Sequence, residues 1–87
     1  MNDITFTAEG FSDYVYWQTQ DKKTLKKINS LLEDIKRNGA MQGIGKPEPL
    51  KHRKGYSRRI DDVNRLVYDI DNLENIKVIS CKGHYED

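Results

Sequence analysis

Several side chains that could cleave RNA stand in the second half of the chain. Glu48 lies between two prolines, Arg59 and Arg65 belong to neighbouring strand-like segments, and His84 and Tyr85 come near the end. A carboxylate and an imidazole can exchange protons with ribose and phosphate oxygens, and guanidinium groups bind phosphate through paired hydrogen bonds. This combination of residue types predicts chemistry on an RNA phosphodiester.

Glu48 can be interpreted in two ways. Pro47 and Pro49 restrict the backbone on both sides, so the carboxylate is held in a stiff, extended segment. It could act as a general base, or it could only balance the charges of Lys46 and Lys51. Spacing alone leaves both interpretations open.

A metal or nucleotide cofactor is not expected. Cys81 and His84 have C-x-x-H spacing, but only His52 could add another soft ligand, whereas a structural zinc site normally has four. The glycines between 39 and 45 lack the spacing of a nucleotide-binding loop. The single cysteine indicates a reducing compartment.

Charge is unevenly distributed, although the net charge is only +1. Residues 1–21 carry four acids and no base (−4), and residues 66–87 carry two bases and five acids (−3). Residues 22–37 have six bases against two acids (+4), and residues 46–65 have seven against three (+4). The middle of the chain is therefore suited to a polyanion. For 22–37 taken alone, a solvated helix face is the better interpretation.

With 87 residues the chain predicts a single domain, 1–87. There is neither a signal-peptide pattern nor an apolar run long enough to span a bilayer, so we expect a cytoplasmic protein without a membrane partner.

The apolar pattern predicts an α+β fold. Five apolar residues recur at helical spacing between Leu25 and Ile35, and Asn38-Gly39 is a typical helix end. We expect the order β-α-α-β-β-β, with a strand at 3–7, a helix at 8–19, a helix from the N-cap Asp21 to 38, and strands at 55–61, 64–70 and 75–82. Both helices should pack on one face of a mostly antiparallel, four-stranded sheet.

Alternation along the strands predicts which side chains share a face. If Ile60 in segment 55–61 faces the helices, as the apolar residues of 64–70 should, then Arg59 and Arg65 both stand on the uncovered face. Two guanidinium groups there would form a phosphate site.

Simpler interpretations exist for the same residues. Arg59 and Arg65 could form surface ion pairs with Asp61 or Asp69. His84 could be an exposed terminal histidine, or a general acid or base at the edge of the arginine-lined sheet.

At this point the chain resembles a known family, the YoeB/Txe toxins of bacterial type II toxin–antitoxin modules, within the RelE superfamily. The resemblance covers nearly the full length. It is carried by six segments in the family's order: Asp13–Trp17, Lys26–Asn29, Gly45–Lys51, Ser57–Ile60, Arg65–Tyr68 and His84-Tyr85. The chain departs from the family's pattern in several places. Tyr56 replaces a common Trp in a stretch, 54–56, that is one residue short, Asn64 replaces a common His, and Gly83 replaces a bulkier residue. Glu86-Asp87 extend beyond the family's usual terminal tyrosine.

The resemblance implies a RelE-like, microbial-RNase-like fold and a ribosome-dependent mRNA endoribonuclease. Such an enzyme cuts the codon in the ribosomal A site, inhibits translation, and needs no metal. The ribose 2′-hydroxyl attacks the adjacent phosphorus and expels the 5′-oxygen.

Roles for individual residues follow from the same resemblance. Glu48 would be the general base, His84 the general acid, and Arg65 would stabilise charge on the phosphoryl group. Tyr85 would position the substrate. Four basic residues would bind the RNA: Lys46, Lys51, Arg58 and Arg59.

The implied partners are a YefM-type antitoxin, the 70S ribosome with its mRNA, and a second copy of the chain in a homodimer. Operator DNA would be contacted only through the antitoxin. Two alternatives to the enzyme stay open: an RNA-binding module that blocks translation without cutting, and a protein that acts mainly as a co-repressor with its antitoxin.

Overall fold

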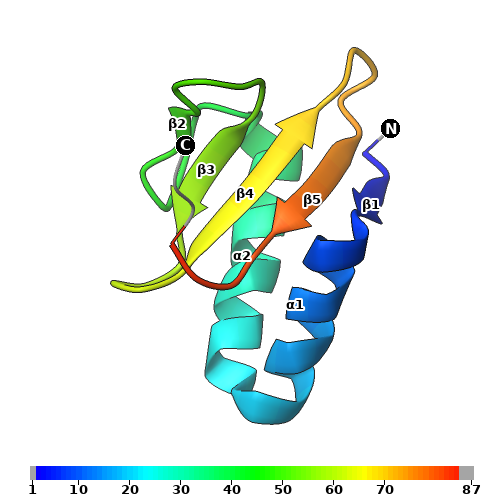
Figure 1. Ribbon diagram of the computed structural model, residues 1–87. Coiled ribbons are helices and arrows are strands. Elements are labelled where there is room, and N and C mark those ends of the chain that lie inside the picture. Colours follow the sequence, from blue (N-terminus) through cyan, green and yellow to red (C-terminus); the bar gives the residue numbers. More distant parts are fainter. Residues whose placement is uncertain (1, 85–87) are drawn as a thin grey trace.

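The computed structural model describes residues 2–84 and forms two helices and five strands (Figure 1). In chain order they are β1 (Ile4–Phe6), α1 (Ala8–Gln20), α2 (Lys22–Asn38), β2 (Glu48–Pro49), β3 (Tyr56–Arg59), β4 (Arg65–Ile70) and β5 (Ile76–Ser80). The predicted α+β class is confirmed, and the six predicted elements all occur. No helix among these residues is long and apolar enough to cross a membrane.

The sheet has five strands where four were expected. Its order is β1-β5-β4-β3-β2, with β1 parallel to β5 and the other pairs antiparallel. The additional strand, Glu48–Pro49, lies between the predicted second helix and the strand predicted at 55–61, where no strand was expected, and it pairs with Tyr56 and Ser57 at the sheet edge. Proline is tolerated at an edge because its missing N–H need not enter a ladder.

Both helices begin at the predicted residues; α2 also ends as predicted, and α1 extends one residue beyond the predicted end, to Gln20. The Thr7 side chain accepts a hydrogen bond from the backbone N–H of Gly10 and caps α1. Asp21 accepts bonds from the N–H groups of Lys23 and Thr24 and caps α2. Gly39 ends α2 with φ at 89°, a backbone angle that favours glycine.

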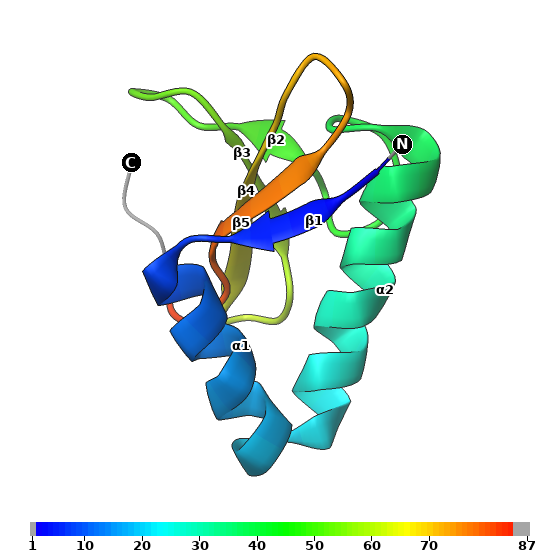
Figure 2. The ribbon, with the colours of Figure 1, turned by 90° about the vertical axis from the view of Figure 1, so that its right-hand side faces the viewer.

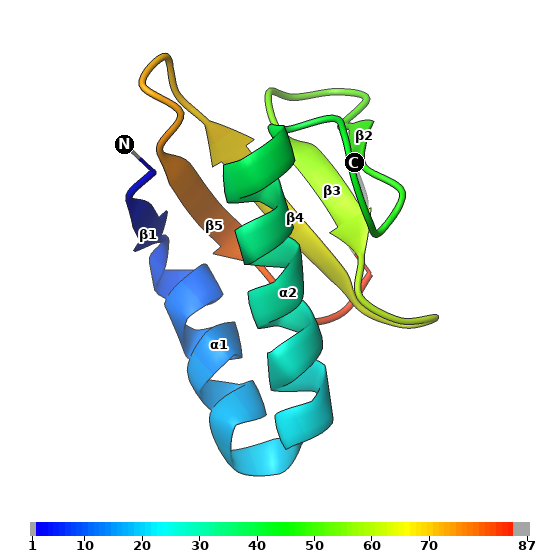
Figure 3. The same ribbon diagram turned by 180° about the vertical axis from the view of Figure 1, so that it is seen from behind.

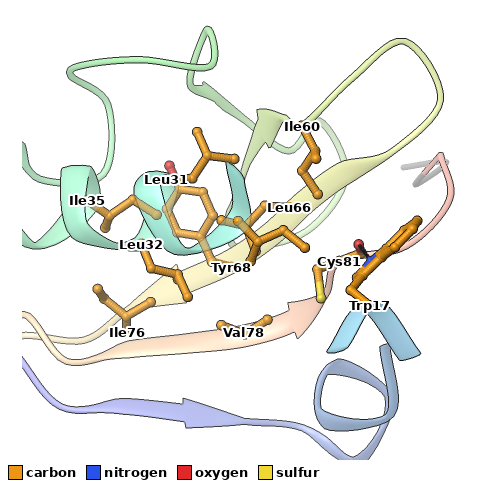
Figure 4. Packing of buried hydrophobic residues seen from close by; sticks show 11 residues of the cluster. Trp17, Leu31, Leu32, Ile35, Ile60, Leu66, Tyr68, Ile76, Val78 and Cys81 are labelled. Carbon is orange, nitrogen blue, oxygen red and sulfur yellow. Dashed lines mark hydrogen bonds between the residues drawn. The ribbon is translucent and has the colours of Figure 1, made fainter. Parts of the chain in front are cut away.

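The core lies between α2 and one face of the sheet. Figure 3 shows α2 crossing in front of β3, β4 and β5, and Figure 4 shows its apolar side chains meeting Leu66 and Tyr68 of β4. Leu31, Ile35 and Leu66 are at most 1% exposed, so this contact contains little water.

Helix α1 packs against the β1–β5 edge and along the lower part of α2 (Figure 2). Its Gly10 lies against the backbone of β5, where a Cβ would be 2.4 Å from the carbonyl oxygen of Val78. The indole N–H of Trp17 donates a hydrogen bond to the carbonyl of Cys81 at 2.8 Å. The end of β5 is thus held by α1, while the opposite face of the sheet carries no helix among residues 2–84 (Figures 1 and 3).

Candidate active site

The helix-free face of the sheet brings together three of the predicted site residues, one from each of three strands. Arg59 of β3 is the direct cross-strand neighbour of Arg65 of β4, and Glu48 of β2 is the neighbour of Ser57. Directly opposed residues in an antiparallel pair project to the same face. The prediction that Arg59 and Arg65 share the uncovered face is confirmed.

Arg65 is held between Ser57 and Glu48. Its Nε and Nη2 donate to the Ser57 hydroxyl at 3.3 and 3.1 Å, and its Nη2 lies 3.4 Å from Glu48 Oε1. The side chain of Arg65 is 19% exposed and that of Glu48 is 64% exposed. A carboxylate and a partly sheltered guanidinium therefore lie side by side, with free access from solvent to the carboxylate.

Arg59 forms an ion pair with Asp62, in the turn between β3 and β4. The simpler interpretation of ion pairs is thus correct in kind, but the partners are Asp62 and Glu48 instead of Asp61 and Asp69. Arg59 is 45% exposed in its side chain and Asp62 is 89% exposed, and pairs so exposed contribute little free energy. A phosphate could replace Asp62 as the partner of Arg59 at small cost.

The chain passes beside β4 again after β5. The backbone N–H of Arg65 donates to the carbonyl of Gly83 at 3.1 Å, so Gly83 lies alongside the first residue of β4. Gly83 has φ at +84°, which turns the chain sharply. His84 follows directly and is exposed. The general-acid candidate therefore emerges beside the strand that carries Arg65.

Two further basic candidates, Lys46 and Lys51, are exposed on either side of β2. Lys46 has a positive φ of 51°, which sets the direction in which the chain enters β2. Tyr85, predicted to position the substrate, lies outside the described residues.

Arg58 contradicts its predicted role in RNA binding, because it is 0% exposed. Its Nη1 lies 2.6 Å from Asp34 Oδ2, and its Nε donates to the Tyr68 hydroxyl at 3.0 Å. The remaining guanidinium bonds go to three backbone carbonyls of the loop after α2, those of Gly39, Gln42 and Ile44. Strand alternation explains the correction, since Arg58 points to the helix side while Arg59 points to the open face.

Two supporting residues were not recognised from the sequence. Ser57 bonds to Arg65, and its position could have been found by pairing β3 with β4, because it shares the face of Arg59. Asn64 precedes β4, and its Oδ1 accepts the N–H of Gly83 at 2.7 Å. No composition signal marks that contact, which spans 19 residues of the chain.

The alternative of a metal site is not supported by the positions of its ligands. Cys81 is 0% exposed on the core side, whereas His84 is exposed to solvent. Burial, together with the nearby charge of Asp13, raises the pKa of Cys81 to about 12. Within residues 2–84 no three His, Cys, Asp or Glu side chains are grouped to hold a metal ion.

Comparison with known proteins gives matches along nearly the whole chain. Residues 6–85 match the family described as YoeB-like toxin of bacterial type II toxin-antitoxin system. The Toxin YoeB of Streptomyces coelicolor is 48% identical over 84 residues, covering 94% of this chain and 98% of that protein.

Solved structures agree with the sequence match. The YoeB dimer from Staphylococcus aureus has a TM-score of 0.90 and 55% identity, covering 97% of this chain and 98% of its own. The heterotetrameric YoeB-YefM toxin-antitoxin complex from the same organism has a TM-score of 0.89 and 54% identity, covering 98% and 99%.

Proposed function

The chain belongs to the YoeB-like toxins of bacterial type II toxin–antitoxin systems, and from this premise we propose that it is a ribosome-dependent endoribonuclease that cuts mRNA in the A site. Cutting there would stop translation, which is the toxic effect. A cytoplasmic location follows from this substrate.

The proposed reaction needs three groups on the uncovered face. Glu48 takes the proton from the ribose 2′-hydroxyl, whose oxygen attacks the adjacent phosphorus. His84 gives a proton to the 5′-oxygen as its bond to phosphorus breaks. The products are a 2′,3′-cyclic phosphate and a free 5′-hydroxyl, and no metal takes part.

Arg65 supplies the electrostatic part of the mechanism. Charge builds up on the nonbridging phosphate oxygens in the transition state, and a fixed guanidinium beside them stabilises it. Two bonds to Ser57 fix the Arg65 side chain before substrate arrives. Arg59 is its cross-strand neighbour, and Lys46 and Lys51 are exposed on either side of β2. We propose that these three residues hold the RNA backbone.

One observation carries the proposal: a solvent-facing carboxylate lies 3.4 Å from a sheltered guanidinium, on the side of the sheet without helices. An ion pair kept only for stability would contribute little at this exposure. Tyr85 would position the substrate by stacking or hydrogen bonding.

The test is primer extension on a ribosome-bound mRNA. Wild-type protein should produce a cut in the A-site codon only when ribosomes are present. Glu48→Ala and His84→Ala should each slow cleavage by about 10²- to 10⁴-fold, and Arg65→Ala by about 10²- to 10³-fold.

Lys77→Ala is the matched control for charge. Lys77 is exposed on β5, where it is the cross-strand neighbour of Asp69 and lies away from Glu48. Its loss should therefore leave the cleavage rate unchanged.

Two outcomes would contradict the proposal. Arrest of translation by the wild-type protein with uncut mRNA would favour the RNA-binding module that blocks translation. Full cleavage by all three site variants would refute the residue assignment.

We further propose that a YefM-type antitoxin neutralises the protein and that the chain forms a homodimer. The Staphylococcus aureus YoeB–YefM complex and YoeB dimer support both statements. Because the site face is rich in arginine and lysine, an acidic segment of the antitoxin would suit it. Operator DNA would then be reached through the antitoxin, in a co-repressor complex.

A further inference from the structure

Asn64 joins the turn before β4 to the segment that carries His84. Its Oδ1 accepts the backbone N–H of Gly83 at 2.7 Å, and its Nδ2 donates to both carboxylate oxygens of Asp61 at 3.2 and 3.1 Å. A carboxylate only accepts and a backbone N–H only donates, so the two partners together fix which way the amide points.

Asp61 is itself held by the backbone of the same turn. Its Oδ1 accepts the N–H groups of Val63 and Asn64 at 2.8 and 2.7 Å. Desolvation raises the pKa of Asp61, but hydrogen bonds from Asn64 and Val63 outweigh it, so that pKa lies below its usual value. Asp61 therefore stays an acceptor at neutral pH.

The backbone of the segment before His84 is hydrogen-bonded at two residues. At Cys81 the backbone N–H donates to Asp13 Oδ2 at 3.0 Å, and the carbonyl accepts from Trp17. At Gly83 the N–H is bound by Asn64 and the carbonyl by the backbone of Arg65. Asn64 is the side chain that binds the second of these residues, one residue before His84.

We propose that Asn64 is a positioning residue that anchors Gly83 and so holds His84 beside Arg65 on the open face. This inference rests on the proposed function of His84 as the general acid. Asn64 acts through His84, and it makes no contact with RNA. Its loss should lower kcat and leave the half-saturating ribosome concentration unchanged.

The structure offers a matched control at the opposite end of the sheet. Asn75 repeats the same arrangement: its Nδ2 donates to Asp71 Oδ2 at 3.3 Å, and its Oδ1 accepts the backbone N–H of Asp3 at 3.0 Å. Asn75→Ala removes a bridge of the same kind, between a turn aspartate and a distant backbone N–H, but does not touch the His84 segment. Any general cost of losing an Asn–Asp turn appears in both variants.

The first measurement is hydrogen exchange of the Gly83 amide in the full chain. Asn64→Ala should speed this exchange, and Asn75→Ala should not.

A double variant, Asp61→Asn with Asn64→Asp, exchanges the two side chains. The amide at position 61 then donates to the carboxylate at position 64, and that carboxylate still accepts the backbone N–H of Gly83. The double variant should restore slow exchange, whereas Asn64→Asp alone places two carboxylates together and should not.

The second measurement is single-turnover cleavage on saturating ribosomes. Asn64→Ala should slow cleavage by about 10- to 100-fold, the range expected for a misplaced reacting group. In a His84→Ala background the same change should have an effect within about twofold, because residues acting through one group are not additive. An equal loss in both backgrounds, or unchanged cleavage, would overturn the inference.

Failure of the proposed function can be distinguished from failure of the Asn64 anchor. If wild-type protein cuts no mRNA, the enzyme assignment falls, and Gly83 exchange alone decides whether the anchor exists. Unchanged exchange in Asn64→Ala would then overturn it.

Discussion

Arg58 has a structural role, whereas Arg59 and Arg65 are available to a ligand, and the difference follows from burial. Arg58 is fully buried and its charge is compensated by Asp34, whereas Arg59 and Arg65 face the open side of the sheet with weaker, more exposed partners. A buried guanidinium with all its donors bonded cannot reach a phosphate. A partly exposed guanidinium can exchange its carboxylate partner for a phosphate, which is what a binding site requires.

Arg58→Ala should unfold the protein more easily. The change leaves the Asp34 carboxylate with 10% side-chain exposure and no cation, and it removes the donor from three loop carbonyls. We expect a loss of about 3–5 kcal/mol in the free energy of unfolding, measured by urea denaturation. Arg37→Ala, at an exposed position of α2, should change it by less than about 0.5 kcal/mol. Equal effects of the two variants would contradict this account.

At the scale of elements, alternation along strands was the most informative signal in the sequence. It correctly placed Arg59 and Arg65 on one face, and helix periodicity with capping residues located α1 and α2. Strand alternation could also have shown that Arg58 points into the core. The resemblance to the family led instead to the wrong prediction that Arg58 binds RNA. Residue type alone does not separate a structural arginine from a functional one.

The conformation of the loop between α2 and β2 could not be predicted from its own sequence. Its shape is set by bonds from Arg58 to Gly39, Gln42 and Ile44, which lie 14 to 19 residues away along the chain. The short strand β2 forms because β3 offers an open edge, and two residues give no periodicity to detect. Long-range pairing, rather than local propensity, determines where Glu48 lies.

Gly10 tests how closely α1 must approach β5. In an isolated helix Gly→Ala is stabilising by about 1 kcal/mol. Here the new Cβ would be 2.4 Å from the Val78 carbonyl oxygen, which belongs to the backbone and cannot move aside alone. We therefore expect Gly10→Ala to lower the free energy of unfolding by about 1–3 kcal/mol, measured by thermal or urea denaturation.

Ser12→Ala, at an exposed position on the same helix, is the control for propensity. It should be neutral or slightly stabilising. A stabilised Gly10→Ala protein would mean that α1 does not lie against β5 as closely as described.

For the whole molecule, four aspartates tie turns and helix ends together, and each has a pKa below its ordinary value of 3.8. For Asp34 the hydrogen bond from Arg58 is the largest cause. For Asp21 the hydroxyl of Thr24 is the largest, and for Asp71 the backbone N–H of Asn75 is. Asp61 is the fourth. These contacts link α2 to the sheet, α1 to α2, and β4 to β5.

Stability should therefore fall as the pH drops below about 4. A carboxylate whose pKa is lower in the folded state stabilises that state above its unfolded pKa of 3.8, and the contribution disappears as the pH falls through the folded pKa. We expect the free energy of unfolding, measured by urea denaturation between pH 6 and pH 2.5, to be flat above pH 5 and to decrease below pH 4.

The variant Asp34→Asn tests how much of this decrease comes from Asp34. It should be less stable at pH 6, and its free energy of unfolding should fall less on acidification, because residue 34 no longer titrates. Parallel curves for the two proteins would show that the Asp34–Arg58 pair does not govern acid unfolding, and that the loop before β2 is held by the neutral bonds of Arg58 instead.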